Sequence, residues 1–442
     1  MIAPFPRRFT GSAFVGQTHG LIGVLVLLMI AFAVSTERRR INLRIVIGGV
    51  LLQFFIAWLL LSFPPAVQAF EWLAEAVTRL ISFADAGTEF VFGKVADPSG
   101  PWGFVFAVKV LPIIIFFASL MAVLYHLGIM QRIVAGVAWV LRSTLGVTGA
   151  EALSAAANIF VGQTEAPLCI RPYLAGMTRS QIMAVMTGGF ATIAGSVLAA
   201  YVMRLGGDDP AQQVLFAKHL MTASVMSAPA GFVMAKIIVP ETQTPPPETL
   251  SALISSERTT RNVVDAAATG AADGLKLALN VAAMLVAFVA LLAMIDWPLQ
   301  AICNLPRVAA WRELHGIPVL DLRTILGFVF TPIAWSVGIP RGDCMAVGSL
   351  LGTQVIATEF YAYLDLADRL EEGTISARAA QIAAYCLCGF ANLPSIAIQI
   401  GGLSALAPER RSDFAALGLR AMIAGALACW MTGSIAGVFI PI

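Results

Sequence analysis

The chain is organised around residues 158–167, which read Asn-Ile-Phe-Val-Gly-Gln-Thr-Glu-Ala-Pro and interrupt two long apolar regions. In a lipid bilayer, irregular backbone and ionisable side chains are tolerated only where protein buries them or where they line a wet cavity. Glu165 is therefore predicted to belong to a functional site. The flanking Gly162 and Pro167 predict the tip of a helical hairpin whose arms are too short to cross a membrane.

Composition places the chain among membrane proteins. Hydrophobic residues make up 58% of the 442 residues and charged residues 12%, against about 45–50% and about 25% in soluble domains. The net charge is +2 and the chain has no basic stripe, so we predict no nucleic-acid partner. We predict membrane lipid as a partner instead. The six cysteines show neither CxxC nor Cys/His spacing, and we predict no disulfide, no structural metal and no cofactor.

Apolar runs long enough to cross a bilayer recur along the chain and predict about eight transmembrane helices. They cover residues 20–34, 45–63, 104–125, 182–203, 214–235, 275–295, 379–400 and 417–440. The first run also fits a signal peptide with a small-residue cleavage site at residues 31–33. The arginine cluster that follows it opposes translocation, so we interpret the run as a first transmembrane helix with the N-terminus outside.

Shorter segments complete the predicted all-α membrane fold. Segments expected at the membrane interface cover residues 67–93, 131–146 and 322–339. A second hairpin candidate covers about residues 343–364 and is centred on Gly352, Thr353, Gln354 and Glu359. Arms of this length fit a dip into the membrane and back, which is a re-entrant hairpin, in both halves of the chain.

The second half of the chain repeats the order of the first: span, interfacial helix, hairpin, broken span, span. The two broken spans share the sequence Gly-Phe-Ala at residues 189–191 and 389–391. Three full crossings in the first repeat make the second enter from the opposite face, so the repeats are inverted, and the charges of the loops put both termini outside. Inverted repeats with discontinuous helices are typical of secondary transporters.

Four units follow from this order of elements. They are an N-terminal scaffold over 1–100, a first repeat over 101–240, a cytoplasmic connection over 241–274 and a second repeat over 275–442.

The polar residues of the hairpins and breaks suit a neutral, hydroxyl-bearing ring compound. The candidate donors and acceptors are Gln163, Thr164, Glu165, Glu359 and Asn392, and Phe390 is available for stacking on a ring. Two carboxylates would repel an anion, and no arginine stands near either tip.

Structural interpretations of the same residues remain open at this point. The glutamine and threonine of the first hairpin also suit helix caps, and each glutamate also suits a structural pair, although substrate binding is the favoured interpretation. Asn158 and Thr192 either satisfy the backbone of the broken helix or join exposed carbonyls in holding a cation.

Three motifs resemble the concentrative nucleoside transporter family. They are Gly162-Gln163-Thr164-Glu165-Ala166-Pro167, Thr358-Glu359-Phe360 after Gly352-Thr353, and Cys388-Gly389-Phe390-Ala391-Asn392 continuing through Ser395 to Gly402. The resemblance covers the chain from residue 20 onward. It implies a homotrimer of eight-span protomers with two hairpins that moves nucleosides inward with a cation gradient.

The resemblance also implies roles for individual residues. Gln163, Thr164 and Val197 would face the nucleobase with Phe390 beside it; Glu359, Asn392 and Ser395 would bind the ribose, and Glu165 would lie near both. The sodium site of sodium-coupled members would map to Asn158, Val161, Thr192 and Ile193.

Four positions depart from the pattern of the family. Gln354 and Thr358 stand where a lysine and an asparagine are common, and Leu393 and Pro394 replace an expected Phe-Ser pair. These changes alter the surroundings of Glu359 and the ribose side of the site, so an altered substrate range is expected.

The sequence thus predicts cation-coupled nucleoside uptake, with sodium or protons, across a bacterial inner membrane, and no enzyme activity. The alternatives are coupled transport of a nucleobase or nucleoside analogue, a channel, and a membrane-embedded hydrolase or receptor. A channel would need a continuous polar face, whereas here the polar residues gather at two hairpins and two breaks.

Overall fold

The computed structural model describes residues 11–97, 100–102, 105–207, 209–245, 260–315 and 319–441. Within these ranges the regular elements are helices, as predicted, and no strand occurs. The first half contains α1 (Gly11–Ala33), α2 (Leu43–Leu61), α3 (Pro64–Phe92), α4 (Phe106–Lys109), α5 (Leu111–His126), α6 (Ile129–Leu145), α7 (Gly149–Asn158), α8 (Arg171–Leu174), α9 (Arg179–Ala191), α10 (Gly195–Gly206) and α11 (Pro210–Ile238). The second half contains α13 (Val263–Cys303), α14 (Pro306–Leu314), α15 (Leu322–Val337), α16 (Cys344–Ile356), α17 (Glu359–Glu371), α18 (Ala377–Cys386), α19 (Leu393–Leu406) and α20 (Arg411–Phe439).

Among the described residues, six helical segments are long and apolar enough to cross a membrane. They are Leu43–Leu61, Phe106–His126, Arg179–Gly206, Pro210–Ile238, Val263–Cys303 and Pro408–Phe439. Shorter apolar helices cover His19–Ala33, Leu322–Val337 and Leu393–Leu406. These lengths and compositions are those of a multi-pass membrane protein.

Both predicted hairpin regions consist of short helices joined at a turn. In the first half, α7 ends at Asn158 and the chain returns through the 3-10 helix Ala166–Ile170 and α8. In the second half, α16 ends at Ile356 and α17 begins at Glu359, so the turn lies at residues 357–358. The prediction that Gly352, Thr353 and Gln354 form the centre of this hairpin is wrong, because all three continue α16. Thr358 caps α17, because its side-chain oxygen accepts a hydrogen bond from Tyr361 N at 3.2 Å.

Both predicted broken spans are interrupted where the sequence places Gly-Phe-Ala. The first is interrupted between α9 and α10, and the second between α18 and α19. The two interruptions touch, since Phe390 N donates to Thr192 O at 3.3 Å. Only glycine fits at position 389, because a Cβ there would lie 2.5 Å from both Phe190 O and Cys429 Sγ. The two breaks are therefore in close contact within the buried core of the protein.

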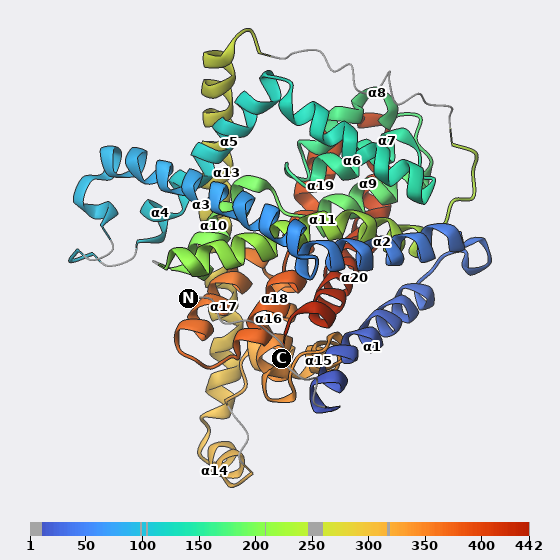
Figure 1. Cartoon of the computed structure of the whole chain (residues 1–442). Helices are drawn as coiled ribbons and strands as arrows, with labels where there is room; N and C mark the ends of the chain where they lie inside the picture. Colours follow the sequence, from blue (N-terminus) through green and yellow to red (C-terminus); the bar gives the residue numbers. More distant parts are fainter. Residues whose placement is uncertain are drawn as a thin grey trace.

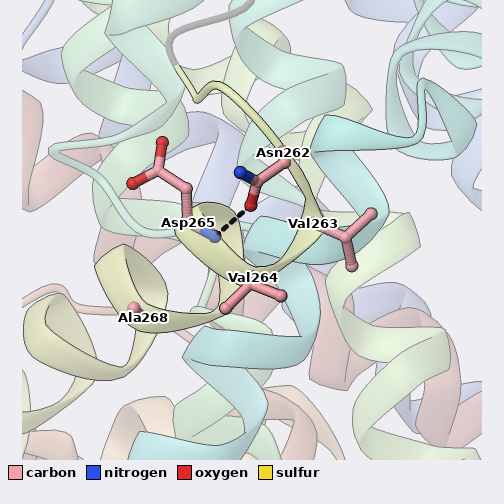
Figure 2. Close-up of a pocket in the computed structure, with 5 residues that line it drawn as sticks. All are labelled: Asn262, Val263, Val264, Asp265 and Ala268. Carbon is pink, nitrogen blue, oxygen red and sulfur yellow. Dashed lines mark hydrogen bonds between the residues drawn. The ribbon is translucent and has the colours of Figure 1, made fainter.

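The long helix α13 runs the length of the molecule and ends near α14 (Figure 1). It begins at Val263, earlier than the apolar run at residue 275 predicts. The N-cap explains this start, because Asn262 Oδ1 accepts a hydrogen bond from Asp265 N at 2.9 Å (Figure 2). Residues 246–259 of the predicted cytoplasmic connection lie outside the described residues.

Small residues let α13 pack closely against α5. A Cβ on Gly270 would lie 2.7 Å from Ala118 O, and one on Gly274 would lie 2.8 Å from Ile115 Cα. Ser119 Oγ also donates to Ala267 O at 2.9 Å. Glycines at a helix contact are typical of membrane helices, whose association depends on close backbone packing.

Candidate functional site

A single cavity of about 1270 Å³ lies between the first hairpin, the two breaks, α5 and α13. All eight residues predicted to bind substrate line it: Gln163, Thr164, Glu165, Val197, Glu359, Phe390, Asn392 and Ser395. Tyr125, Thr269, Asn280, Thr358 and Phe360 also contribute to its wall. Polar groups from both halves of the chain therefore converge on one space that is large enough for a small solute.

The turn of the first hairpin presents Glu165 to this cavity. Glu165 N donates to Gly162 O at 3.2 Å, which closes the turn. The carboxylate folds back over Gly162, where a Cβ would lie 2.2 Å from Glu165 Oε2. The side chain is exposed to the cavity. Among the described residues, no side chain of another helix donates a hydrogen bond to it.

Glycines in the broken helices allow the hairpin tip to approach. A Cβ on Gly189 would lie 2.8 Å from Gln163 Cβ, and one on Gly402 would lie 2.8 Å from Thr164 Cγ2. Gln163 is nearly buried, and its Oε1 has no hydrogen-bond partner among the described residues. An unpaired buried amide oxygen that faces a cavity is available to bind a donor on a ligand.

Glu359 has a different environment, because two side chains hold its carboxylate. The residue is 5% exposed and is the first residue of α17. Its Oε2 accepts a hydrogen bond from Asn392 Nδ2 at 2.5 Å, and its Oε1 accepts one from Tyr201 Oη at 3.0 Å. Asn392 is fixed in turn as the N-cap of α19, since its Oδ1 accepts from Ser395 N at 2.8 Å.

Sequence reasoning missed Tyr201. The available signal was a phenol in the apolar helix that follows the first break, because a buried tyrosine hydroxyl requires a partner. The sequence did not reveal that this partner is a glutamate 158 positions away in the chain.

The residues predicted to hold a cation lie beside the first break. Asn158 is 1% exposed, and both polar atoms of its side chain lack a hydrogen-bond partner among the described residues. Thr192 Oγ1 donates to Gly188 O at 2.9 Å. Ile193 is fully buried, and Val161 lines the cavity. An orphaned amide oxygen next to unwound backbone fits an oxygen-binding cation such as sodium.

Gln354 hydrogen-bonds to the backbone of the second break and does not line the cavity. Its Nε2 donates to Leu387 O at 3.3 Å and to Gly389 O at 3.2 Å, and the side chain is fully buried. These carbonyls belong to the interrupted segment between α18 and α19, where the regular helical hydrogen bonds are missing, and Leu387 O also accepts a hydrogen bond from Gly389 N at 2.8 Å. The glutamine therefore has a structural position that its sequence alone did not indicate.

Of the other three positions that depart from the family pattern, Thr358 is the one found among the described residues that line the cavity. Thr358 lines the cavity while it caps α17. Pro394 stands in the first turn of α19, where its missing N–H is not required. Leu393 is exposed, and it does not line the cavity.

Comparison with family models identifies three matching segments. Residues 22–95 match the model described as Na+ dependent nucleoside transporter N-terminus. Residues 107–208 match the nucleoside recognition (Gate) model, and residues 219–437 match Na+ dependent nucleoside transporter C-terminus. The two hairpins and both breaks therefore fall within matched segments.

The alignments with individual relatives cover nearly the whole of this chain. An uncharacterized transporter of Haemophilus influenzae is 44% identical over 95% of this chain and 97% of its own length. The sodium/nucleoside cotransporter 1 of Mus musculus is 39% identical over 96% of this chain and 64% of its own.

Solved structures agree with this relation. CNTnw in an inward-facing substrate-bound state is 41% identical and superposes with a TM-score of 0.86, covering 95% of this chain and 97% of that one. A variant of CNTnw in an outward-facing state superposes with a TM-score of 0.85 at 41% identity, over 96% of this chain and 97% of that one. Together with its apolar helices, these matches show that the chain is a multi-pass membrane protein of the concentrative nucleoside transporter family.

Proposed function

We propose that this protein takes up nucleosides by symport with sodium across a bacterial inner membrane. The observation that carries the proposal is the convergence of amides and carboxylates from both halves of the chain on one cavity. Neutral donors and acceptors suit a base, and carboxylates accept hydrogen bonds from sugar hydroxyls. The membership of the chain in a Na+-dependent nucleoside transporter family supports the same cargo.

The cavity suggests how a nucleoside is oriented in it. Gln163 and Thr164 offer amide and hydroxyl groups to the edge of the base, with Val197 and Phe390 against its face. Glu359, Asn392 and Ser395 form the ribose end, where the carboxylate is already held in place. Glu165 lies at the same wall and adapts to either end.

The coupling ion in this proposal is sodium, held by Asn158 together with Val161, Thr192 and Ile193. The support is the unpaired, buried amide of Asn158 beside the first break. A cation that fills this place would satisfy the amide oxygen and connect the first hairpin with the broken helix that lines the cargo space. Cargo and cation would then stabilise the same arrangement.

The proposed architecture has eight spans, two re-entrant hairpins and two inverted repeats, with both termini outside. The unit bounds are those predicted from the sequence: 1–100, 101–240, 241–274 and 275–442. Three copies would associate through α13, whose apolar side chains Leu279, Val286 and Trp297 are more than half exposed in the single chain. Cross-linking in the membrane tests this assembly, with a trimer as the expected product and a monomer as the contrary one.

Uptake into proteoliposomes tests the function. With an inward sodium gradient, radiolabelled uridine should accumulate above its external concentration and saturate, and dissipating the gradient should abolish accumulation. A proton gradient imposed alone should not drive uptake. Accumulation with a proton gradient only would show that protons, and not sodium, are the coupling ion. Accumulation of uracil but not of uridine would show that the cargo is a nucleobase. Equilibration without accumulation would favour a channel and contradict the proposal.

A further inference from the structure

We propose that Tyr201 is a positioning residue that holds Glu359 from the side away from the cavity and thereby sets the affinity for cargo with ribose hydroxyls. This inference rests on the proposed function, because it assumes that Glu359 receives the sugar. Tyr201 belongs to α10 in the first half of the chain and Glu359 to α17 in the second. The sugar end of the site is thus completed across the two halves.

The geometry places Tyr201 behind the carboxylate. Tyr201 is 1% exposed and is absent from the described residues that line the cavity, whereas Glu359 lines it. The phenol donates to Glu359 Oε1 at 3.0 Å. Tyr201 therefore does not touch the cargo, and its influence acts through the orientation of Glu359.

Aromatic packing fixes the phenol ring. Tyr201 stacks on Tyr363 with 4.1 Å between ring centroids and 25° between ring planes. Phe360 meets the same ring edge-on at 5.1 Å. The hydroxyl of Tyr363 donates to Ala384 O at 2.6 Å and not to Glu359, so Tyr363 supports the neighbouring tyrosine through its ring alone. A ring held on two sides keeps its hydroxyl directed at Glu359 before any cargo arrives.

The two hydrogen bonds to Glu359 act as a pair. Asn392 holds Oε2 and Tyr201 holds Oε1, so the carboxylate cannot rotate without breaking one of them. Each carboxylate oxygen accepts more than one hydrogen bond, which leaves acceptor capacity for hydroxyl groups in the cavity. A receptor group that is fixed beforehand binds more tightly, because less conformational freedom is lost on binding.

The test compares two cargoes that share a base: uridine and 2′,3′-dideoxyuridine, in proteoliposomes of Tyr201→Phe. The substitution removes one hydroxyl and keeps the ring. We expect the KM for uridine to rise about tenfold, equivalent to about 1.4 kcal/mol, while the KM for the dideoxy compound changes by less than about twofold. Equal changes for both cargoes, or no change for uridine, would overturn the assignment.

Tyr363→Phe is the matched control, because it makes the same chemical change in the same aromatic stack. Its hydroxyl bonds a backbone carbonyl and does not touch Glu359. We expect this variant to keep the wild-type ratio of the two KM values. If it shifts the ratio as much as Tyr201→Phe does, the effect belongs to packing and the proposal is wrong.

A second measurement covers variants that transport poorly. The rise in melting temperature that uridine causes in the full-length protein in detergent measures binding, and it does not require transport. Tyr201→Phe should weaken it in the wild-type background and have no further effect in a Glu359→Gln background, since the tyrosine acts through that carboxylate. Independent, additive effects would overturn the proposal. If the wild-type protein neither binds nor moves any nucleoside, the proposed function itself fails, which is a different outcome.

Discussion

The two hairpins carry one glutamate each, and the two carboxylates have opposite surroundings. Glu359 is nearly buried and held by Tyr201 and Asn392. Glu165 is exposed to the cavity and folds over Gly162 within its own turn. Under the proposed function, the site would combine a carboxylate that other helices hold with one that only its own turn surrounds, although the sequence presents the two glutamates as equivalents.

The broken helices explain the difference. When the shared Gly-Phe-Ala segments are aligned, Tyr201 of the first half corresponds to Gly401 of the second. Gly401 has no side chain, and a Cβ added to it would meet nothing within 4 Å. The second half therefore has no counterpart of Tyr201 to hold Glu165. The next residue, Gly402, instead admits the tip of the first hairpin.

The two breaks also differ in how the polar side chains beside them are hydrogen-bonded. At the second break, the amide of Gln354 donates to two carbonyls of the interrupted backbone. At the first break, the amide of Asn158 has no partner among the described residues. Under the proposed function, the amide of Asn158 would bind the ion at the first break, whereas the second break is already supplied with a donor.

The largest expected effect is that of Glu359→Gln. The near-isosteric change removes the charge that accepts hydroxyl groups, and hydrogen bonds to charged groups contribute about 1.5–3 kcal/mol each. We expect Vmax/KM for uridine to fall about 100-fold or more in proteoliposomes. Wild-type uptake by a variant that melts normally in detergent would show that Glu359 is not the fixed receptor.

Asn158→Ala should weaken the binding of sodium rather than that of the nucleoside. We expect the sodium concentration for half-maximal uptake to rise at least about tenfold, because the unpaired amide oxygen is lost. The control in the other half is Gln354→Met, which should lower the melting temperature and leave the sodium dependence unchanged. If both variants change the sodium dependence alike, the contrast between the two breaks is wrong.

Gly189→Ala tests how the hairpin tip is seated. A new Cβ would lie 2.4 Å from Gln399 Nε2 and 2.8 Å from Gln163 Cβ, and such overpacking costs about 1–3 kcal/mol. We expect uridine affinity to fall about fivefold to tenfold in a binding titration. Gly401→Ala is the control, since its Cβ would meet no other atom within 4 Å; a similar loss in both variants would contradict the account.

The smallest effect is expected for Glu165→Gln. Its carboxylate is exposed to the cavity and no side chain of another helix among the described residues holds it, so loss of the charge should raise the KM for uridine by only about twofold to fivefold. The measurement is uptake beside Glu359→Gln under identical conditions. A loss as large as that of Glu359→Gln would mean that the two hairpins contribute equally, contrary to the comparison.

Much of this fold could be predicted from the sequence, because apolar run length and glycine-rich interruptions are local signals. The first hairpin turn and both breaks occur where Gly162 and the Gly-Phe-Ala segments place them, whereas the second turn lies at residues 357–358, beyond the predicted centre at Gly352, Thr353 and Gln354. The motifs of the family also supplied eight residues that line one cavity. The early start of α13 depended on a cap at Asn262, which hydropathy does not reveal.

The long-range contacts could not be predicted in this way. The bonds from Tyr201 to Glu359 and from Gln354 to the second break join residues whose proximity depends on how helices pack, which periodicity does not encode. The difference between the two glutamates depends on these contacts, so it emerged only from the structure.

The most direct test of the account is a cryo-electron microscopy structure of the full-length protein in lipid nanodiscs with uridine and sodium. The account predicts uridine in the cavity, with its ribose hydroxyls within hydrogen-bond distance of Glu359 and its base beside Gln163, while Tyr201 still bonds the carboxylate. Uridine bound elsewhere, or bound in this cavity with its ribose away from Glu359, would contradict it.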